Sequence, residues 1–482
     1  MIVFNEDEDS KNETDVYFFQ IIAIGVLGTL FFVLSGIIFP KNISDVYIPK
    51  ININSQKNDD SARISDNSVV LHDEFSDSVA IMFYAMLEEK EAAIKPALEQ
   101  KEEYVKEEKH FVEKNIHADV LGGFFSKLYA LETSGEGVVR IAYYGDSMIE
   151  GDYIVQTIRS LFQKKYGGKG VGIVPVSLAH TSARQTVKHT FSTNWQYSSV
   201  MKRNALPLGI AACVSFCPEG ESSWVSYQSG TQKIVNPTLL YGKSDNKNAK
   251  ALVTSSSFEE EVALNPDKKL NFLRINGVGD SIVLEFIDAQ NIPFFGINFS
   301  QSKGVYIDNF SVRGSSGLPL IHLEKDIMNA FHKSFDYDLV ILQFGANVIR
   351  QDVKTYKWYS EKMVKVVEHL RECFPGADVL VISAADKAAK YGAEIKTDSL
   401  VYPLLRSQRE YANITNSGFI NLFQLMGGEG TMAQWVSMDP PLGSKDLVHF
   451  SYPGTNIIAN KIYEKLDSQY RNYKKNIEKG IR

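Results

Sequence analysis

Cysteine is scarce in this chain. Its 482 residues include only Cys213, Cys217 and Cys373, too few for a disulfide framework. Cys213 and Cys217 are four residues apart, and on a strand that spacing holds two thiols too far apart to bond, so we expect buried free thiols. No cysteine–histidine cluster has zinc-ligand spacing, and the sequence predicts neither a metal nor another cofactor.

Basic charge is also in deficit. The formal net charge is -7, which provides no electrostatic attraction for nucleic acid. A nucleotide-binding loop is lacking as well: the glycine-rich segment 167–172 does not directly follow a strand, and its lysine is not followed by Ser or Thr. We interpret that segment as a bend in the chain. A hydrophobic content of 44% over this length predicts two or more folded units.

Long apolar runs are limited to residues 17–39, which follow a polar tail, residues 1–16. As a helix this run would be about 35 Å long, enough to cross a bilayer core of about 30 Å once. A cleaved signal peptide is the alternative, but Asp15 and Pro40 flank the run instead of a basic segment and a small-residue cleavage site. The few flanking lysines weakly favour a cytoplasmic C-terminal part.

Between this run and the first predicted domain, the chain is polar and then highly charged. Residues 40–72 form a predicted linker, and residues 73–119, rich in Glu and Lys, a predicted helical stalk. Leu98, Val105 and Val112 are seven apart, but Pro96 interrupts the pattern. A solvated helix is therefore favoured over a coiled coil.

A strand, a tight turn and a helix follow one another over residues 138–165. The apolar run ends in Gly145-Asp146-Ser147, and a helix with one apolar face begins near Tyr153. This layout places the Ser147 hydroxyl at the carboxyl end of a strand and the N-terminus of a helix. Free backbone N–H groups there can stabilise an anion.

Two further polar groups stand at the ends of predicted elements. A second apolar strand, residues 338–344, ends in Gly345-Ala346-Asn347, and Asp446 and His449 precede the last predicted helix. An open parallel sheet gathers such groups at the carboxyl ends of its strands. Three residues apart, the Asp446 carboxylate can reach one imidazole nitrogen of His449 and leave the other for Ser147. The alternative is a surface Asp–His pair beside the helix.

An acyl-transfer site also needs donors for the oxyanion. We predict the Ser147 N–H, the Asn347 amide and the Gly314 N–H for this role. An ordinary turn asparagine and a loop glycine are the alternatives for the last two.

Strand and helix patterns alternate over most of the remaining chain. Residues 120–181 and 301–482 form the two parts of a predicted α/β domain with a parallel sheet. Residues 182–300 instead carry short alternating runs separated by turn residues, which predicts an inserted β-sandwich. In the second α/β part we expect helices at 353–374, 400–412 and 455–466, and strands at 338–344, 378–385 and 418–423.

Four motifs occur in the order seen in SGNH/GDSL hydrolases, which this chain therefore resembles. They are Gly145-Asp146-Ser147, Gly314, Gly345-Ala346-Asn347 and the pair Asp446 and His449. The resemblance implies a three-layer, flavodoxin-like α/β fold with Ser147 as nucleophile, His449 as base and Asp446 as its orienting carboxylate. It also implies an oxyanion hole formed by Ser147, Gly314 and Asn347. Val348 departs from the pattern, because an acidic residue usually follows the asparagine.

The position of the β-insert is similar to that in bacterial peptidoglycan O-acetylesterases. Met426-Gly427-Gly428, Trp435 and the segment 446–450 also resemble the C-terminal part of that group. The resemblance implies a serine esterase that removes O-acetyl groups from an acetylated envelope or extracellular polysaccharide, with peptidoglycan one such substrate. Because such polymers lie outside the cytoplasm, we expect single-pass anchoring in the inner membrane with the catalytic domain on the periplasmic or extracytoplasmic side.

Two other functions fit the same sequence. An O-acetyltransferase would pass the acyl group to a sugar hydroxyl instead of water. A non-catalytic glycan-binding protein would use Trp195 or Trp224 of the insert as a stacking platform, although both are expected in the core. The sequence leaves the oligomeric state open.

Overall fold

The computed structural model describes residues 120–178, 184–202, 206–230, 233–301, 303–350, 353, 355–392 and 394–480. The predicted tail 1–16, membrane span 17–39, linker 40–72 and stalk 73–119 lie outside the described residues and stay predictions. Within the described ranges, no helix combines the length and the apolar character needed to cross a membrane.

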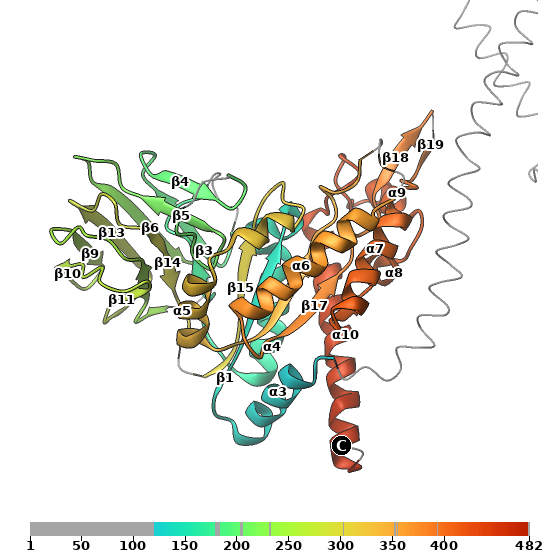
Figure 1. Cartoon of the computed structure of the whole chain (residues 1–482), viewed down its shortest axis with the longest axis horizontal. Coiled ribbons are helices and arrows are strands. Elements are labelled where there is room, and N and C mark those ends of the chain that lie inside the picture. The colour runs from blue at the N-terminus through green and yellow to red at the C-terminus, as the bar shows by residue number, and fades with distance from the viewer. Residues whose placement is uncertain are drawn as a thin grey trace, which may run out of the picture. The chain divides into compact units, whose positions relative to one another are not determined.

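A five-stranded parallel sheet forms the centre of the α/β domain (Figure 1). Its strand order is β15-β1-β16-β17-β20, and each neighbouring pair is parallel. The strands are β1 (Val138–Gly145), β15 (Gly304–Ser311), β16 (Tyr337–Gln343), β17 (Asp378–Ile382) and β20 (Gly418–Ile420). Nearly every residue of β1 and β16 is buried, as expected for parallel strands covered on both faces.

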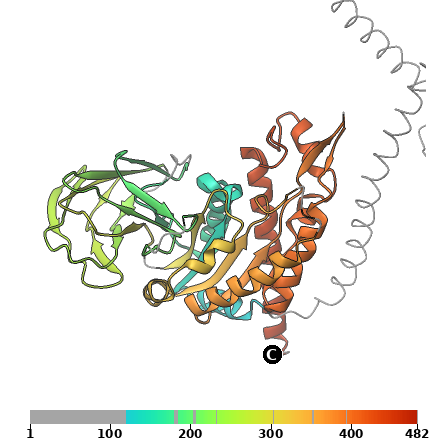
Figure 2. The same cartoon turned by 45° about the horizontal axis from the view of Figure 1, so that its top comes forward.

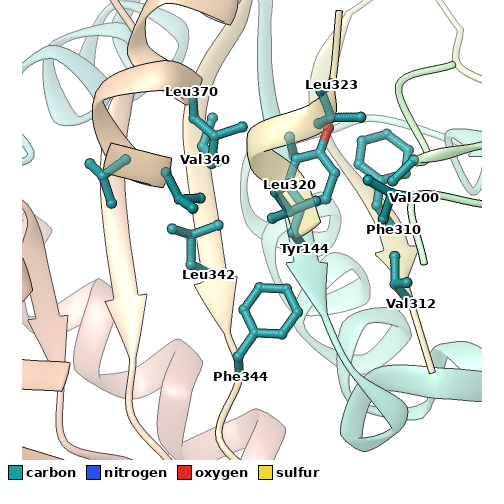
Figure 3. Packing of buried hydrophobic residues seen from close by; sticks show 14 of the residues in the cluster. Tyr144, Val200, Phe310, Val312, Leu320, Leu323, Val340, Leu342, Phe344 and Leu370 are labelled. Atoms are coloured by element: carbon teal, nitrogen blue, oxygen red, sulfur yellow. The ribbon is translucent and has the colours of Figure 1, made fainter. Parts of the chain in front are cut away.

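Helices cover both faces of this sheet, giving the predicted three layers (Figure 2). One layer contains α3 (Gly122–Ser134), α4 (Tyr153–Tyr166) and α10 (Tyr452–Glu478), and the other contains α5 (Lys325–Phe335), α6 (Lys357–Cys373) and α7 (Val401–Ile414). Successive side chains of β1 alternate between the layers: Ile141 and Tyr143 face the first, and Ala142 and Tyr144 the second. Figure 3 shows the hydrophobic core between the sheet and the layer of α5, α6 and α7, in which Tyr144 lies among residues of several elements.

The predicted elements differ from the observed ones mainly at their ends. The helix expected from residue 353 begins at Lys357, and the strand expected to reach residue 423 ends at Ile420. The Asn421 side chain accepts from the Gln424 N–H and starts the short helix α8 (Leu422–Met426), which α9 (Thr431–Ser437) follows. Helix α10 begins three residues before the expected start, because Ser451 caps it and Pro453 occupies its first turn.

The inserted β-domain consists of two antiparallel sheets with a common core. One has the order β10-β9-β13-β6-β3, and the other the order β11-β8-β14-β5-β4 with β2 paired to β14. The strands are β2 (Ile173–Val174), β3 (Val187–Phe191), β4 (Gln196–Ser199), β5 (Cys213–Phe216), β6 (Ser223–Ser229), β8 (Thr238–Tyr241), β9 (Lys250–Ser255), β10 (Glu259–Ala263), β11 (Asn271–Arg274), β13 (Ser281–Ile287) and β14 (Phe294–Asn298). Since β2 precedes residue 182, pairing in this domain starts before the segment assigned to it from sequence.

Short elements complete the described structure. They are the paired strands β7 (Ile234–Val235) and β12 (Val278–Gly279), the hairpin β18 (Ala388–Tyr391) and β19 (Glu394–Thr397), and the 3-10 segments η3 (Ser147–Asp152) and η4 (Leu318–His322). The three cysteines are buried and unpaired, which confirms the prediction of free thiols. Trp195 is buried in the sandwich core, as predicted, but the same prediction is wrong for Trp224, which is 40% exposed.

The β-domain is joined to the α/β domain by a buried polar network. The Arg140 guanidinium donates to both carboxylate oxygens of Asp308 at 2.7 and 3.1 Å, and to Asn298 Oδ1 at 3.1 Å. Asp308 Oδ1 also accepts from the Ile173 N–H at 2.7 Å. Gly172 allows this approach: its φ is 78°, and a Cβ there would lie 1.9 Å from Asp308 Oδ1. The predicted glycine-rich bend therefore links the two domains.

Candidate active site

Ser147, His449 and Asp446 form a continuous chain of hydrogen bonds. Ser147 Oγ lies 2.8 Å from His449 Nε2, although the two residues are 302 positions apart. His449 Nδ1 lies 2.7 Å from Asp446 Oδ2. Because a carboxylate only accepts, Nδ1 carries the ring proton, and Nε2 is left to accept from the serine hydroxyl. The structure thus brings the three predicted triad residues together in the order that proton transfer requires.

The loop that holds His449 is stiffened by the Asp446 carboxylate. Asp446 Oδ1 accepts from the backbone N–H groups of Val448 and His449, both at 2.9 Å. Leu447 has a φ of 64°, a left-handed conformation that closes this tight loop. Although partial burial opposes ionisation, hydrogen bonds from these N–H groups and from the imidazole hold the pKa of Asp446 below its ordinary value. Asp446 therefore stays charged beside the imidazole.

Asp146, next to the serine, is a second carboxylate at the site. It is completely buried, accepts from the Met148 N–H at 2.9 Å and caps the η3 turn that begins at Ser147. Burial raises its pKa to about 6, while hydrogen bonds to the carboxylate oppose the rise. Sequence reasoning assigned no separate role to Asp146. Its place directly before a helical turn, where Asp accepts backbone N–H groups, was the signal available.

Asn347 lies beside Asp146. Its Nδ2 donates to Asp146 Oδ2 at 3.1 Å and to the Ser315 carbonyl at 3.2 Å. An amide has two N–H donors and both have partners here, so donation to a reacting oxygen would require the exchange of one of them. Asn347 thus connects the loop after β16 with the serine turn and with the loop after β15.

The loop after β15 also contains Gly314. Its φ is 77°, and no atom lies within 4 Å of where a Cβ would stand. The next residue, Ser315, accepts from Asn347, so the predicted glycine and asparagine loops meet beside Asp146. The oxyanion roles of Ser147, Gly314 and Asn347 stay predictions.

Val348 departs from the family pattern for a packing reason. It is 3% exposed and belongs to the core cluster between the sheet and helices α5 to α7. A carboxylate at this position would be buried among apolar side chains at a high desolvation cost.

A small cavity lies between the loops that carry the predicted residues. Its volume is about 20 Å³, enough for one water molecule or a methyl-sized group. Asp146, Met148, Ala346 and Val448 line it, and each is the chain neighbour of Ser147, Asn347 or His449. Ala384 and Ala385, just after β17, and Ile349 also line it.

Met426 and Trp435, which the sequence comparison with peptidoglycan O-acetylesterases singled out, contact residues next to the site. Met426 Sδ is 3.1 Å from the backbone nitrogen of Asp386, a residue that lines the cavity. Trp435 is buried, packs on Phe450 with ring centroids 5.7 Å apart, and accepts at its carbonyl from Leu442 and Gly443. These residues support the loops around the cavity and the imidazole.

Among the described residues, no cluster of three or more His, Cys, Asp or Glu side chains could hold a metal ion.

Comparison with known proteins gives similarity in structure alone, because no family model and no curated protein matches the sequence. A solved peptidoglycan O-acetylesterase aligns with 73% of this chain and 96% of its own, at a TM-score of 0.60 and 22% identity. A lipase/acylhydrolase from Enterococcus faecalis aligns with 34% of this chain and 77% of its own, at a TM-score of 0.25 and 19% identity. An acetyl xylan esterase aligns with 33% of this chain and 81% of its own, at a TM-score of 0.26 and 18% identity.

The first of these similarities extends over nearly all of the other protein, and it shows a shared fold. The other two TM-scores are too low to carry weight. The chain therefore shares its α/β fold with a solved peptidoglycan O-acetylesterase, the group that its motifs resemble.

Proposed function

We propose that this protein is a serine esterase that removes O-acetyl groups from an envelope or extracellular polysaccharide. One observation carries the proposal: the Ser147 hydroxyl lies 2.8 Å from an imidazole nitrogen whose partner nitrogen is 2.7 Å from a carboxylate. A serine hydroxyl becomes a useful nucleophile when a base in this position removes its proton. The shared fold with a peptidoglycan O-acetylesterase supports the same chemistry.

In the proposed reaction, Ser147 Oγ attacks the ester carbonyl carbon while His449 Nε2 takes the hydroxyl proton. Asp446 keeps the imidazole oriented and stabilises its positive charge. The bond to the sugar oxygen then breaks, and His449 returns the proton to that oxygen. Water, activated by the same imidazole, hydrolyses the acetyl-serine and releases acetate.

The cavity supports a small acyl group. The cavity of about 20 Å³ has room for a methyl-sized group, and several of its lining residues neighbour Ser147, Asn347 or His449 in the chain. An acetyl group in the ester of the substrate would place its methyl here. Each methylene excluded from such a pocket changes specificity by about 10- to 200-fold.

We also propose that residues 17–39 anchor the protein in the inner membrane, with the catalytic domain on the periplasmic or extracytoplasmic side. The apolar run in the sequence and the external location of acetylated envelope polymers support this arrangement.

Acetate release tests the proposed reaction. The full chain is incubated with O-acetylated peptidoglycan, acetylated xylan or other acetylated polysaccharides, without any added sugar acceptor, and free acetate is measured. We expect release from at least one polymer, and none above background with Ser147→Ala. Loss of acetyl groups from the polymer that requires an added sugar acceptor, with the acetyl recovered on that acceptor and not as free acetate, would indicate the acetyltransferase instead. A folded chain that releases no acetate and transfers none would contradict both reactions.

A further inference from the structure

A second concave site lies at the junction of the α/β domain and the β-domain. It is a groove of about 510 Å³ between helix α4 on one side and strand β3 with the end of β6 on the other. This volume is within the range of about 300 to 1,000 Å³ that is typical of ligand sites. Neither the triad nor the small cavity contributes a residue to it.

The lining of this groove combines polar and apolar residues in about equal measure, and its charged side chains are paired. Arg159 and Lys233 are its charged residues among those described, and each is neutralised, by Asp152 at 2.8 Å and by Asp280 at 2.7 Å. Most of the other polar lining groups are amides and hydroxyls. Amides and hydroxyls both donate and accept, so they match sugar hydroxyls better than they match phosphate or an acidic peptide.

Three of these polar groups have no protein partner. Within the described part of the chain, the side chains of Gln156, Ser160 and Gln185 make no hydrogen bond, and Ser160 and Gln185 are exposed. Leu161, nearby on α4, adds apolar surface to the groove. Free donors and acceptors beside apolar surface are the features with which proteins bind the edges and faces of sugar rings.

One face of α4 connects the groove with the triad. Gln156, Ser160 and Gln163 follow Tyr153 at spacings of three, four and three residues, so the four side chains lie along one side of the helix. Helix α4 begins directly after the η3 turn of Ser147. Tyr153 packs against Tyr452, which is 45% exposed, with ring centroids 5.3 Å apart. From Tyr153 to Gln163 the helix rises about 15 Å.

We infer that this groove binds uncharged sugar residues of the polysaccharide strand, away from the ester that is cleaved. The inference rests on the proposed function and deepens it, because it makes the enzyme selective for polymers over short esters. Remote binding of this kind raises affinity for the polymer without changing the chemistry at the serine.

Blocking the groove tests this inference. Ser160→Trp places a large ring in it from an exposed helical position, and Ser468→Trp is the matched control on the exposed side of α10. We expect Ser160→Trp to raise KM for acetylated polysaccharide about tenfold, equivalent to about 1.4 kcal/mol, and to leave kcat/KM for p-nitrophenyl acetate unchanged. The double variant Gln156→Ala, Gln185→Ala should act in the same direction. Equal polymer KM values for all variants would overturn the inference.

A binding assay separates failure of the groove from failure of the esterase. Full-length Ser147→Ala protein, with and without Ser160→Trp, is sedimented with insoluble peptidoglycan or insoluble xylan. We expect Ser160→Trp to reduce the bound fraction on at least one polymer, whether or not the wild type releases acetate. No binding, or equal binding with and without the tryptophan, would overturn the inference that the groove binds sugar residues. The esterase proposal would be unaffected.

Discussion

Two aspartates flank the same serine–histidine contact and differ in almost every physical respect. Asp146 is fully buried and its pKa is raised to about 6, whereas the Asp446 side chain is 48% exposed and its pKa is lowered. Asp446 accepts three hydrogen bonds, two from backbone and one from the imidazole. The difference shows that the exposed carboxylate is the one kept charged beside the base, and that the buried one acts mainly as a structural acceptor.

The largest loss of esterase activity is expected on substitution of Ser147, the residue beside Asp146 that contacts the imidazole held by Asp446. Ser147→Ala removes the nucleophile, and we expect p-nitrophenyl acetate hydrolysis to fall about 10⁴-fold or more. The measurement is steady-state kcat/KM, with circular dichroism to show that the variant is folded. Retention of even a tenth of the activity would mean that neither aspartate belongs to a serine esterase.

Asp446→Asn should have the next largest effect. An asparagine amide facing His449 Nδ1 favours the wrong imidazole tautomer, so we expect kcat to fall about 10³-fold with the melting temperature nearly unchanged. The check is kcat for p-nitrophenyl acetate. If kcat fell no further than in Asp146→Asn, the proposal that Asp446 orients the imidazole while Asp146 is mainly a structural acceptor would be wrong.

Asp146→Asn should cost less activity but alter stability. Its carboxamide keeps an acceptor for the Met148 N–H, but its amide can face that of Asn347, so we expect about a 10- to 100-fold loss of kcat. Urea unfolding should show a loss of stability of about 1–3 kcal/mol near pH 4, where the protonated carboxyl contributes fully, and a smaller loss near neutral pH.

The stability contributions of Asp146 and Asp446 change with pH in opposite directions. Because the folded pKa of Asp146, about 6, is above the ordinary 3.8, its contribution is full below about pH 4 and is lost as the pH rises through 6. Asp446, with its lowered pKa, contributes above 3.8 and loses that contribution on acidification. Urea unfolding between pH 4 and 7 should therefore show a weaker fall of stability for Asp146→Asn than for the wild type. Asp338, also raised to about 6, retains its own part of the fall in both proteins. Parallel curves would contradict this assignment.

The smallest expected effect is on acyl selectivity. Ile349→Ala enlarges the small cavity that Asp146 lines, and we expect the ratio of p-nitrophenyl butyrate to p-nitrophenyl acetate turnover to rise about tenfold. Ile321→Ala, a substitution at an exposed position away from the cavity, is the control. An unchanged ratio would show that the acyl methyl lies elsewhere.

Much of the fold was predictable because it depends on short-range patterns. Buried parallel strands are continuous apolar runs, and the alternation in residues 281–286 reappears as alternating burial along β13. Element ends were harder to predict, because local caps such as Ser451 and Asn421 decide them. The domain boundary was harder still, since β2 has only two residues and depends on β14 for its partner.

The sequence by itself determined the local devices: a serine between a strand and a helix, an aspartate three residues before a histidine, and apolar faces for a layered α/β core. These follow from backbone geometry over a few residues. Only the tertiary structure decided that Ser147 meets His449 across 302 positions, that Asp146 is buried while Asp446 is not, and that a groove forms along α4. Those features depend on which distant surfaces pack together, and burial and long-range contacts are set by that packing rather than by residue spacing.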